Sequence, residues 1–271
     1  FGTFFLGQGN LASDGVSEKD LSGTQLAFSN GGNDGALFFR SSVNNALITN
    51  TKGAFFDGGA GRNNRVRYDT PTFAGFRAGI SVDSRGDFDA GLHFNKKDLA
   101  GVDISAGFGY ANFGRNNAKG VVDINGIAQR VSGSLGILHR GTGLNIYGAA
   151  GTFINQFTLF GGTTPNAGNN TFFEVQAGWK GNIFDFGGTA LAVAYHRGNI
   201  RANTLVANTF TRQRPQFIAV KAVQKIDALS MELYARYVRY FTRINGQIVG
   251  VGFTTPTRAI NVVAVGARVR F

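Results

Sequence analysis

Hydrophobic and polar residues alternate along nearly the whole chain, and this two-residue period predicts β-strands. In the last segment, 258–271, valines, alanine and the terminal Phe271 share one face, while Arg268 and Arg270 lie on the other. No helix-forming block longer than about two turns interrupts the pattern. Twelve strands are predicted, over residues 2–9, 64–69, 76–83, 87–95, 102–111, 129–138, 144–154, 171–180, 189–197, 214–223, 229–241 and 258–271.

The two faces of these strands distinguish a membrane barrel from a soluble sandwich. The polar face is crowded with Gly, Ala and Ser beside isolated charges, whereas a sandwich would present bulky Lys, Glu and Thr to water. Aromatic residues such as Tyr110 and Trp179 stand near strand ends, where interfacial girdles form in membrane barrels. Because lipid leaves no backbone group unpaired, such a sheet must close on itself. The predicted fold class is therefore all-β, a transmembrane antiparallel β-barrel.

Composition and charge exclude several other classes of protein and of functional site. The absence of cysteine removes disulfides, thiolate metal sites and catalytic cysteines. No segment approaches the roughly 18 apolar residues of a membrane helix. The net charge of +11 first suggests nucleic acid, yet the basic residues are scattered, with no Lys/Arg run longer than two. We predict no nucleic-acid partner, no cofactor and no metal, since His93, His139 and His196 lack metal-ligand spacing.

The connections between predicted strands alternate between short and longer polar stretches. Residues 139–143 and 225–230 are short, whereas 112–126 is long, and the connection over about 10–63 exceeds all others. No domain linker is present, so residues 1–271 are predicted to form a single β-barrel domain.

Two blocks, LGQGNLASDGVSEKDLSGT (6–24) and RVRYDTPTFAGFRAGISV (65–82), together with the terminal strand ending in Phe271, resemble the Gram-negative general porins of the alphaproteobacterial type. The resemblance implies a bacterial outer-membrane location, a homotrimer, and a sixteen-stranded barrel whose long loop after the fifth strand folds inward to narrow the pore. If residues 2–9 correspond to that fifth strand, about four strands precede the given sequence. A complete twelve-stranded barrel is the alternative.

A porin sorts solutes by pore width and by lining charge, so its site is an electrostatic constriction rather than a catalytic centre. In the long connection, the acidic candidates are Asp14, Glu18 and Asp20. The basic candidates, placed on the inward face by strand phase, are Arg65, Arg67, Arg77, Arg130, Lys221, Arg236 and Arg268. A field between an acidic loop and a basic wall would favour hydrated solutes and, given the net positive charge, weakly prefer anions. Arg270 is assigned to the periplasmic rim and Arg239, which shares a face with Tyr237, to the outer rim.

The expected function is therefore passive, non-enzymatic diffusion of small hydrophilic solutes and ions, with membrane lipid and lipopolysaccharide as partners. One alternative is a substrate-specific channel for sugars or anions, because Tyr147, Phe153, Tyr234 and Tyr240 face inward by phase. An outer-membrane phospholipase is a weaker alternative. It needs a serine nucleophile with a nearby histidine base. In that enzyme family the histidine and the serine stand two residues apart on one strand, whereas here the residues two after each histidine are Asn or Gly.

Overall fold

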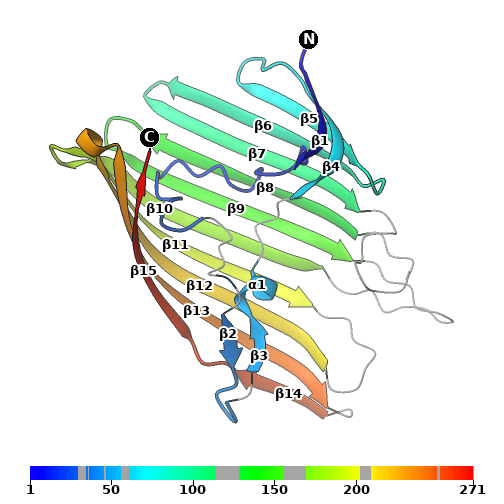
Figure 1. The fold of residues 1–271 in the computed structure, drawn as a ribbon. Coiled ribbons are helices and arrows are strands. Elements are labelled where there is room, and N and C mark those ends of the chain that lie inside the picture. The colour runs from blue at the N-terminus through cyan, green and yellow to red at the C-terminus, as the bar shows by residue number, and fades with distance from the viewer. Residues whose placement is uncertain are drawn as a thin grey trace.

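The computed structural model describes residues 1–29, 35, 37–45, 47–55, 61–113, 128–155, 169–201, 209–248 and 251–270. Thirteen strands form one curved antiparallel sheet, which we call the wall (Figure 1). They are β1 (Thr3–Asn10), β4 (Arg62–Asp69), β5 (Phe76–Asp83), β6 (Phe88–Leu99), β7 (Val102–Phe113), β8 (Ala128–His139), β9 (Leu144–Asn155), β10 (Asn170–Phe184), β11 (Gly187–Arg201), β12 (Thr209–Ile226), β13 (Met231–Ile248), β14 (Val251–Pro256) and β15 (Ile260–Val269).

All twelve predicted strands are present in the wall. The wall has thirteen strands in twelve positions, since β14 and β15 both pair with β13 and occupy one position in the sheet. Two details differ from the prediction. β14 was not predicted, and β12 and β13 each reach 18 residues. Between β14 and β15 the chain leaves the wall, since Thr257 bridges to Ser41 and the Arg258 N–H donates to the Arg40 carbonyl.

Within the described residues β1 pairs only with β4 and β15 only with β13, so these two edges do not meet (Figure 1). Strand connections fall at two ends. Short connections join the strands at one end of the wall, at residues 70–75, 100–101, 140–143, 185–186 and 227–230. In outer-membrane barrels the short turns are periplasmic. We therefore call this end the short-turn end.

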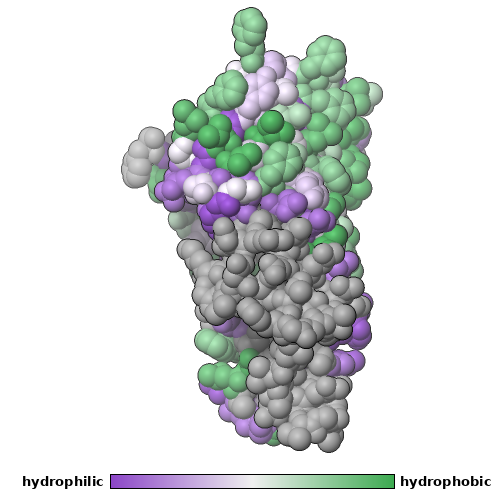
Figure 2. Space-filling view, turned by 90° about the vertical axis from the view of Figure 1, so that its right-hand side faces the viewer, coloured by the Kyte–Doolittle hydropathy of each residue, from purple (hydrophilic) through white to green (hydrophobic). Residues whose placement is uncertain are grey.

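Alternate residues of each strand lie on opposite faces of the wall. On β11, Val193 is 52 % exposed, while its neighbours Ala192 and Ala194 are buried. The exposed residues of most strands are Val, Leu, Ile and Phe, and Val263 and Val265 of β15 are about three-quarters exposed. In Figure 2, hydrophobic residues gather in the upper part of the view, including its upper right-hand edge. An apolar outer face of this kind suits lipid.

Residues 11–28, which we call the inner segment, lie against the other face of the wall (Figure 1). Hydrogen bonds hold it there. The Ala12 N–H donates to the Ser81 hydroxyl at 3.0 Å, and the Ser13 N–H donates to the Asp89 carboxylate at 2.5 Å. Farther along, the Tyr147 hydroxyl of β9 donates to a carbonyl of the segment. The inner segment therefore crosses successive strands from β5 onward.

Glycines on the inner face allow this close approach. A Cβ on Gly91, Gly107 or Gly136 would lie 2.2, 2.4 or 1.9 Å from a carbonyl oxygen of the inner segment, far inside van der Waals contact. These glycines belong to the consecutive strands β6, β7 and β8. The abundance of glycine on the polar face thus has a structural reason, since any larger residue there would push the inner segment off the wall.

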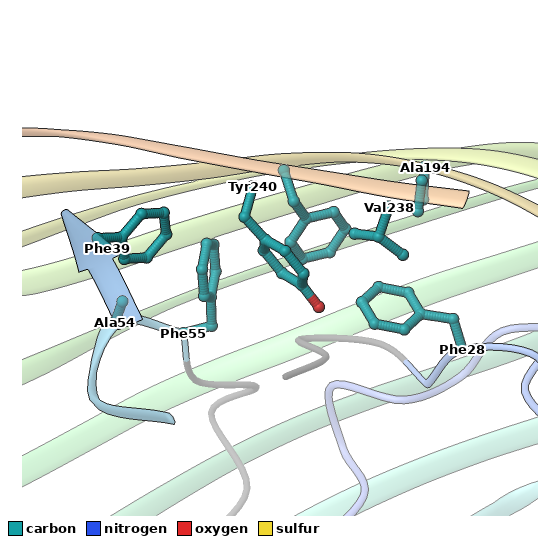
Figure 3. Close-up of a cluster of buried hydrophobic side chains, with 9 residues drawn as sticks. Phe28, Phe39, Ala54, Phe55, Ala194, Val238 and Tyr240 are labelled. Carbon is teal, nitrogen blue, oxygen red and sulfur yellow. The ribbon is translucent and has the colours of Figure 1, made fainter. Parts of the chain in front are cut away.

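The far end of the long connection is fixed by an aromatic cluster (Figure 3). The small hairpin of β2 (Phe38–Arg40) and β3 (Leu47–Asn50) is followed by α1 (Thr51–Ala54). Phe28, Phe39 and Phe55 of this connection pack against Tyr240 and Phe217 of the wall, and all are buried. The Phe28 and Phe217 rings meet edge to face, with centroids 5.3 Å apart. Burial of each ring contributes about 1.5–3 kcal/mol, so this cluster is the main apolar core of the molecule.

Candidate pore constriction

The three carboxylates predicted in the long connection lie on the inner segment in different surroundings. Asp14 lies half-buried in the turn 12–17, and Glu18, which follows that turn, is exposed. Asp20 is buried, and its carboxylate accepts hydrogen bonds from the backbone N–H and hydroxyl of Ser22 at 2.7 and 2.9 Å. Asp20 therefore stabilises its own turn, while Glu18 is the carboxylate most open to solvent.

Arg65 and Arg67 extend from β4 beside the start of the inner segment. Arg65 donates to the Asn10 carbonyl at 2.7 Å. Arg67 binds both oxygens of Asp69, at 2.6 and 2.8 Å, in a bidentate ion pair. Bidentate pairs of this type fix geometry and balance charge. Consequently, the charge of Arg67 is balanced within β4, and Arg67 also donates to the Leu11 carbonyl of the inner segment at 3.0 Å. Arg65 has no ion pair with a described carboxylate.

Arg77 of β5 lies in the same region. Its guanidinium is 3.8 Å from the Asp69 carboxylate and 44 % of its side chain is exposed. Lys19 of the inner segment is close enough to Arg77 to be influenced by its positive charge. The pKa of Lys19 is lowered first by burial and then by this charge. The nearby Glu18 and Asp14 act in the opposite direction and raise the pKa of Lys19. Charges of both signs thus meet at this end of the inner segment.

Lys221 of β12 and Arg236 of β13 lie beneath the other end of the inner segment. Lys221 is 1 % exposed, and its ammonium donates to the Phe28 carbonyl at 3.2 Å. Arg236 donates to the Ala27 carbonyl at 2.7 Å, and its guanidinium lies 5.3 Å from the centre of the Phe28 ring. Asp20 is near enough to attract Lys221 electrostatically. Both bases therefore anchor the inner segment through its backbone.

The two remaining predicted bases lie apart from these groups. Arg130 of β8 stacks over Phe153, with 5.1 Å from the guanidinium carbon to the ring centre. Arg268 of β15 donates from Nε to the Glu232 carboxylate at 2.7 Å, and Arg270 reaches the same carboxylate at 3.2 Å. Arg268 and Arg270 lie near the short-turn end, where the Arg270 N–H donates to the carbonyl of Ser230 in the β12–β13 turn.

The structure also places the residues assigned to the rims. Arg239 is exposed on the same face as Tyr237. Phe271 lies outside the described residues. The bases predicted from strand phase therefore fall into separate groups along the wall: Arg65, Arg67 and Arg77 at the start of the inner segment, Lys221 and Arg236 at its end, Arg130 beside Phe153, and Arg268 near the short-turn end.

The candidate residues chosen from the sequence did not include the carboxylates of the wall itself. Asp69, Asp89, Glu174 and Glu232 all lie on inward positions and are buried. Asp69 could have been found, because a carboxylate two residues after Arg67 shares its face of the strand. Glu174 contacts His196 of the next strand at 3.1 Å, a pairing that depends on strand register. The inner face thus carries both signs of charge.

No metal-binding group emerges from the described part of the chain, where no three His, Asp or Glu side chains come together. None of the helices in the described ranges has the length and hydrophobicity of a membrane-spanning helix.

An antiparallel wall with an apolar outer face, a polar inner face and a chain segment folded against that inner face defines the outer-membrane β-barrel fold. This fold confirms the predicted fold class and places the protein in the bacterial outer membrane.

Comparison with solved structures supports this class. Outer-membrane expressed OmpT of Vibrio cholerae matches with a TM-score of 0.55 and 16 % sequence identity over 98 % of this chain and 76 % of that chain. The in-vitro folded form of the same outer membrane protein matches with a TM-score of 0.52, 15 % identity and the same coverage. At these identities the likeness shows the fold alone. No protein-family model and no curated protein matches the sequence.

Proposed function

We propose that the protein is a general diffusion porin, a passive and non-enzymatic channel for small hydrophilic solutes and ions. The observation that carries this proposal is the inner segment. It lies on the polar face of a membrane wall and brings Glu18, Lys19 and Arg77 together there. A segment held across the inside of a barrel narrows its lumen, and charges at the narrowing sort solutes by sign and hydration.

The proposed preference for anions is weak, because much of the wall's positive charge is compensated. Arg67 is paired with Asp69, and Arg268 with Glu232. Beside the start of the inner segment, Arg65 has no ion pair with a described carboxylate, and Arg77 shares Asp69 with Arg67 at 3.8 Å. Lumen charge selects ions of opposite sign, so we propose that these two bases contribute to the preference.

The arrangement of inner aromatics favours general over substrate-specific diffusion. A sugar pathway needs exposed aromatic faces in a row, yet Tyr147 and Tyr240 are buried beneath the long connection. Tyr147 donates its hydroxyl to the inner segment, and Tyr240 packs against Phe28 and Phe55. These rings support the connection instead of lining a path.

The positions of two of the three histidines also argue against phospholipase chemistry, which needs a histidine base on the outer face. His93 and His196 are inward-facing and buried. His196 is sandwiched between Phe172 and Phe217, with ring centroids 5.8 and 5.0 Å away. We therefore propose no catalytic role for either side chain.

We further propose that the protein forms a homotrimer surrounded by outer-membrane lipid and lipopolysaccharide. The outer face of β15, with Val263 and Val265 strongly exposed, suits either a neighbouring subunit or lipid chains. Electrophoresis of the unheated protein separates these options. A band at three times the subunit mass supports the trimer, and a monomer band contradicts it.

Two measurements test the proposed function together. In liposomes containing the folded protein, uptake of sugars should fall smoothly with increasing sugar size. In a planar bilayer with a KCl gradient, the reversal potential should show a modest preference for chloride. Impermeable liposomes would contradict the channel itself, whereas strong cation selectivity would contradict only the proposed preference.

A further inference from the structure

A hollow of about 670 Å³ lies between the inner segment and the wall near the short-turn end, apart from the charged groups beside β4 and β5. Leu26 contributes from the inner segment, and Lys180, Lys225 and Glu232 contribute from β10, β12 and β13. Its volume falls within the roughly 300–1,000 Å³ of small-molecule sites. It is therefore large enough for a small organic solute.

The charged groups around this hollow are mostly basic. Among the described lining residues, Lys180, Lys225, Arg268 and Arg270 are basic, and Glu232 is the single acidic residue. Glu232 already accepts hydrogen bonds from both arginines. In the described part of the chain neither lysine forms an ion pair, and both lysines are exposed. The hollow therefore has an excess of positive charge that an anion would balance.

Both arginines retain hydrogen-bond donors. A guanidinium carries five N–H groups, and the bonds to Glu232 use only some of them on Arg268 and Arg270. The Arg268 side chain is 43 % exposed and that of Arg270 is 66 % exposed. Their shared carboxylate holds the two guanidiniums at fixed positions, which suits recognition of a planar carboxylate.

One side of the hollow is apolar. Ala190 and Val223 of the wall are buried and pack with Leu26 of the inner segment. The stem of Lys180 also passes close to the inner segment, since a Cβ on Gly23 would lie 3.8 Å from its Cδ and Cε atoms. An apolar side beside a basic rim favours a ligand with a short hydrocarbon body and negatively charged ends over a bare inorganic anion.

We propose that this hollow is a binding site for short aliphatic dicarboxylates on the short-turn side of the constriction. The inference deepens the proposed porin function, because it names the class of solute that pauses beside the inner segment. One carboxylate would bind Arg268 and Arg270 and the other Lys180 and Lys225, with the hydrocarbon body against Leu26.

Binding can be measured without relying on conduction. Isothermal titration calorimetry of the folded protein in detergent, with succinate as the probe, should give saturable binding. Lys180→Gln combined with Lys225→Gln should weaken it roughly 25-fold, because each of the two cations near a carboxylate in water is worth about fivefold in affinity. Lys96→Gln is the matched control. It removes one exposed lysine of β6, near the same end but outside the hollow, and should leave affinity unchanged.

The outcomes separate this inference from the proposed function. Absence of succinate binding, or equal affinity in the wild type and the double lysine variant, overturns the site even if the protein conducts ions. Inorganic phosphate binding as tightly as succinate overturns the dicarboxylate assignment, because the hydrocarbon body would then contribute nothing. Succinate binding by a protein that conducts no ions supports the site and contradicts the porin function.

Discussion

The contact between Gly136 and the inner segment gives the sharpest test of how the inner segment is held against the wall. A Cβ at this position would lie 1.9 Å from the Lys19 carbonyl oxygen, about 1.5 Å short of the 3.4 Å at which ordinary contact begins. Gly136→Ala must therefore displace the segment. The displacement breaks two hydrogen bonds at Ser134, one from the Lys19 N–H at 3.2 Å and one to the Val16 carbonyl at 2.6 Å.

Loss of these two bonds should cost about 1–3 kcal/mol of local stability, at roughly 0.5–1.5 kcal/mol each. Hydrogen exchange measured by mass spectrometry should then speed up roughly 5- to 150-fold for residues 16–20, while exchange in the strands stays slow. Gly148→Ala on β9 is the matched control, since its Cβ would meet nothing nearer than 3.9 Å. Equal protection of the inner segment in both variants would refute this reasoning.

Three further predictions concern the anchoring and the charge of the inner segment. Asp89→Ala should increase hydrogen exchange at residues 12–14, because the Ser13 N–H loses its carboxylate, whereas Asp98→Asn near the exposed end of β6 should not. Unchanged exchange in Asp89→Ala would contradict the anchoring role. Phe55→Ala should lower the free energy of unfolding, measured in urea, by about 3–5 kcal/mol, since the ring is buried against Tyr240. A loss below about 1 kcal/mol would contradict the place of Phe55 in the core. Arg65→Gln should shift the KCl reversal potential toward cations, because Arg65 has no described ion pair; no shift would rule out its proposed role in anion preference.

Much of the fold could be predicted because a β-strand exposes alternate residues to different surroundings. Val193 and its neighbours Ala192 and Ala194 show this directly, with the valine toward lipid and the alanines inside. The same alternation places Lys221 and Arg236 inward without knowledge of the sheet. β14 was missed because it depends on a break at 257–259, where the chain pairs with the hairpin of β2 and β3.

The partners of the charged side chains depend on distances that a sequence does not contain. Arg236 is bonded to the carbonyl of Ala27, 209 residues away along the chain. Arg268 meets Glu232 through the register between β13 and β15. Strand phase therefore predicts which side of the wall a charge occupies, but only the packing of the inner segment decides whether that charge is paired, buried or open to solutes.

The proposed porin function requires that water fills the space beside the inner segment and connects both sides of the membrane. Single-channel recording in planar bilayers tests it most directly. We expect discrete conductance steps whose size rises nearly in proportion to KCl concentration, because the ions would move through water. Folded protein that inserts into the bilayer and produces no steps at any salt concentration would contradict it.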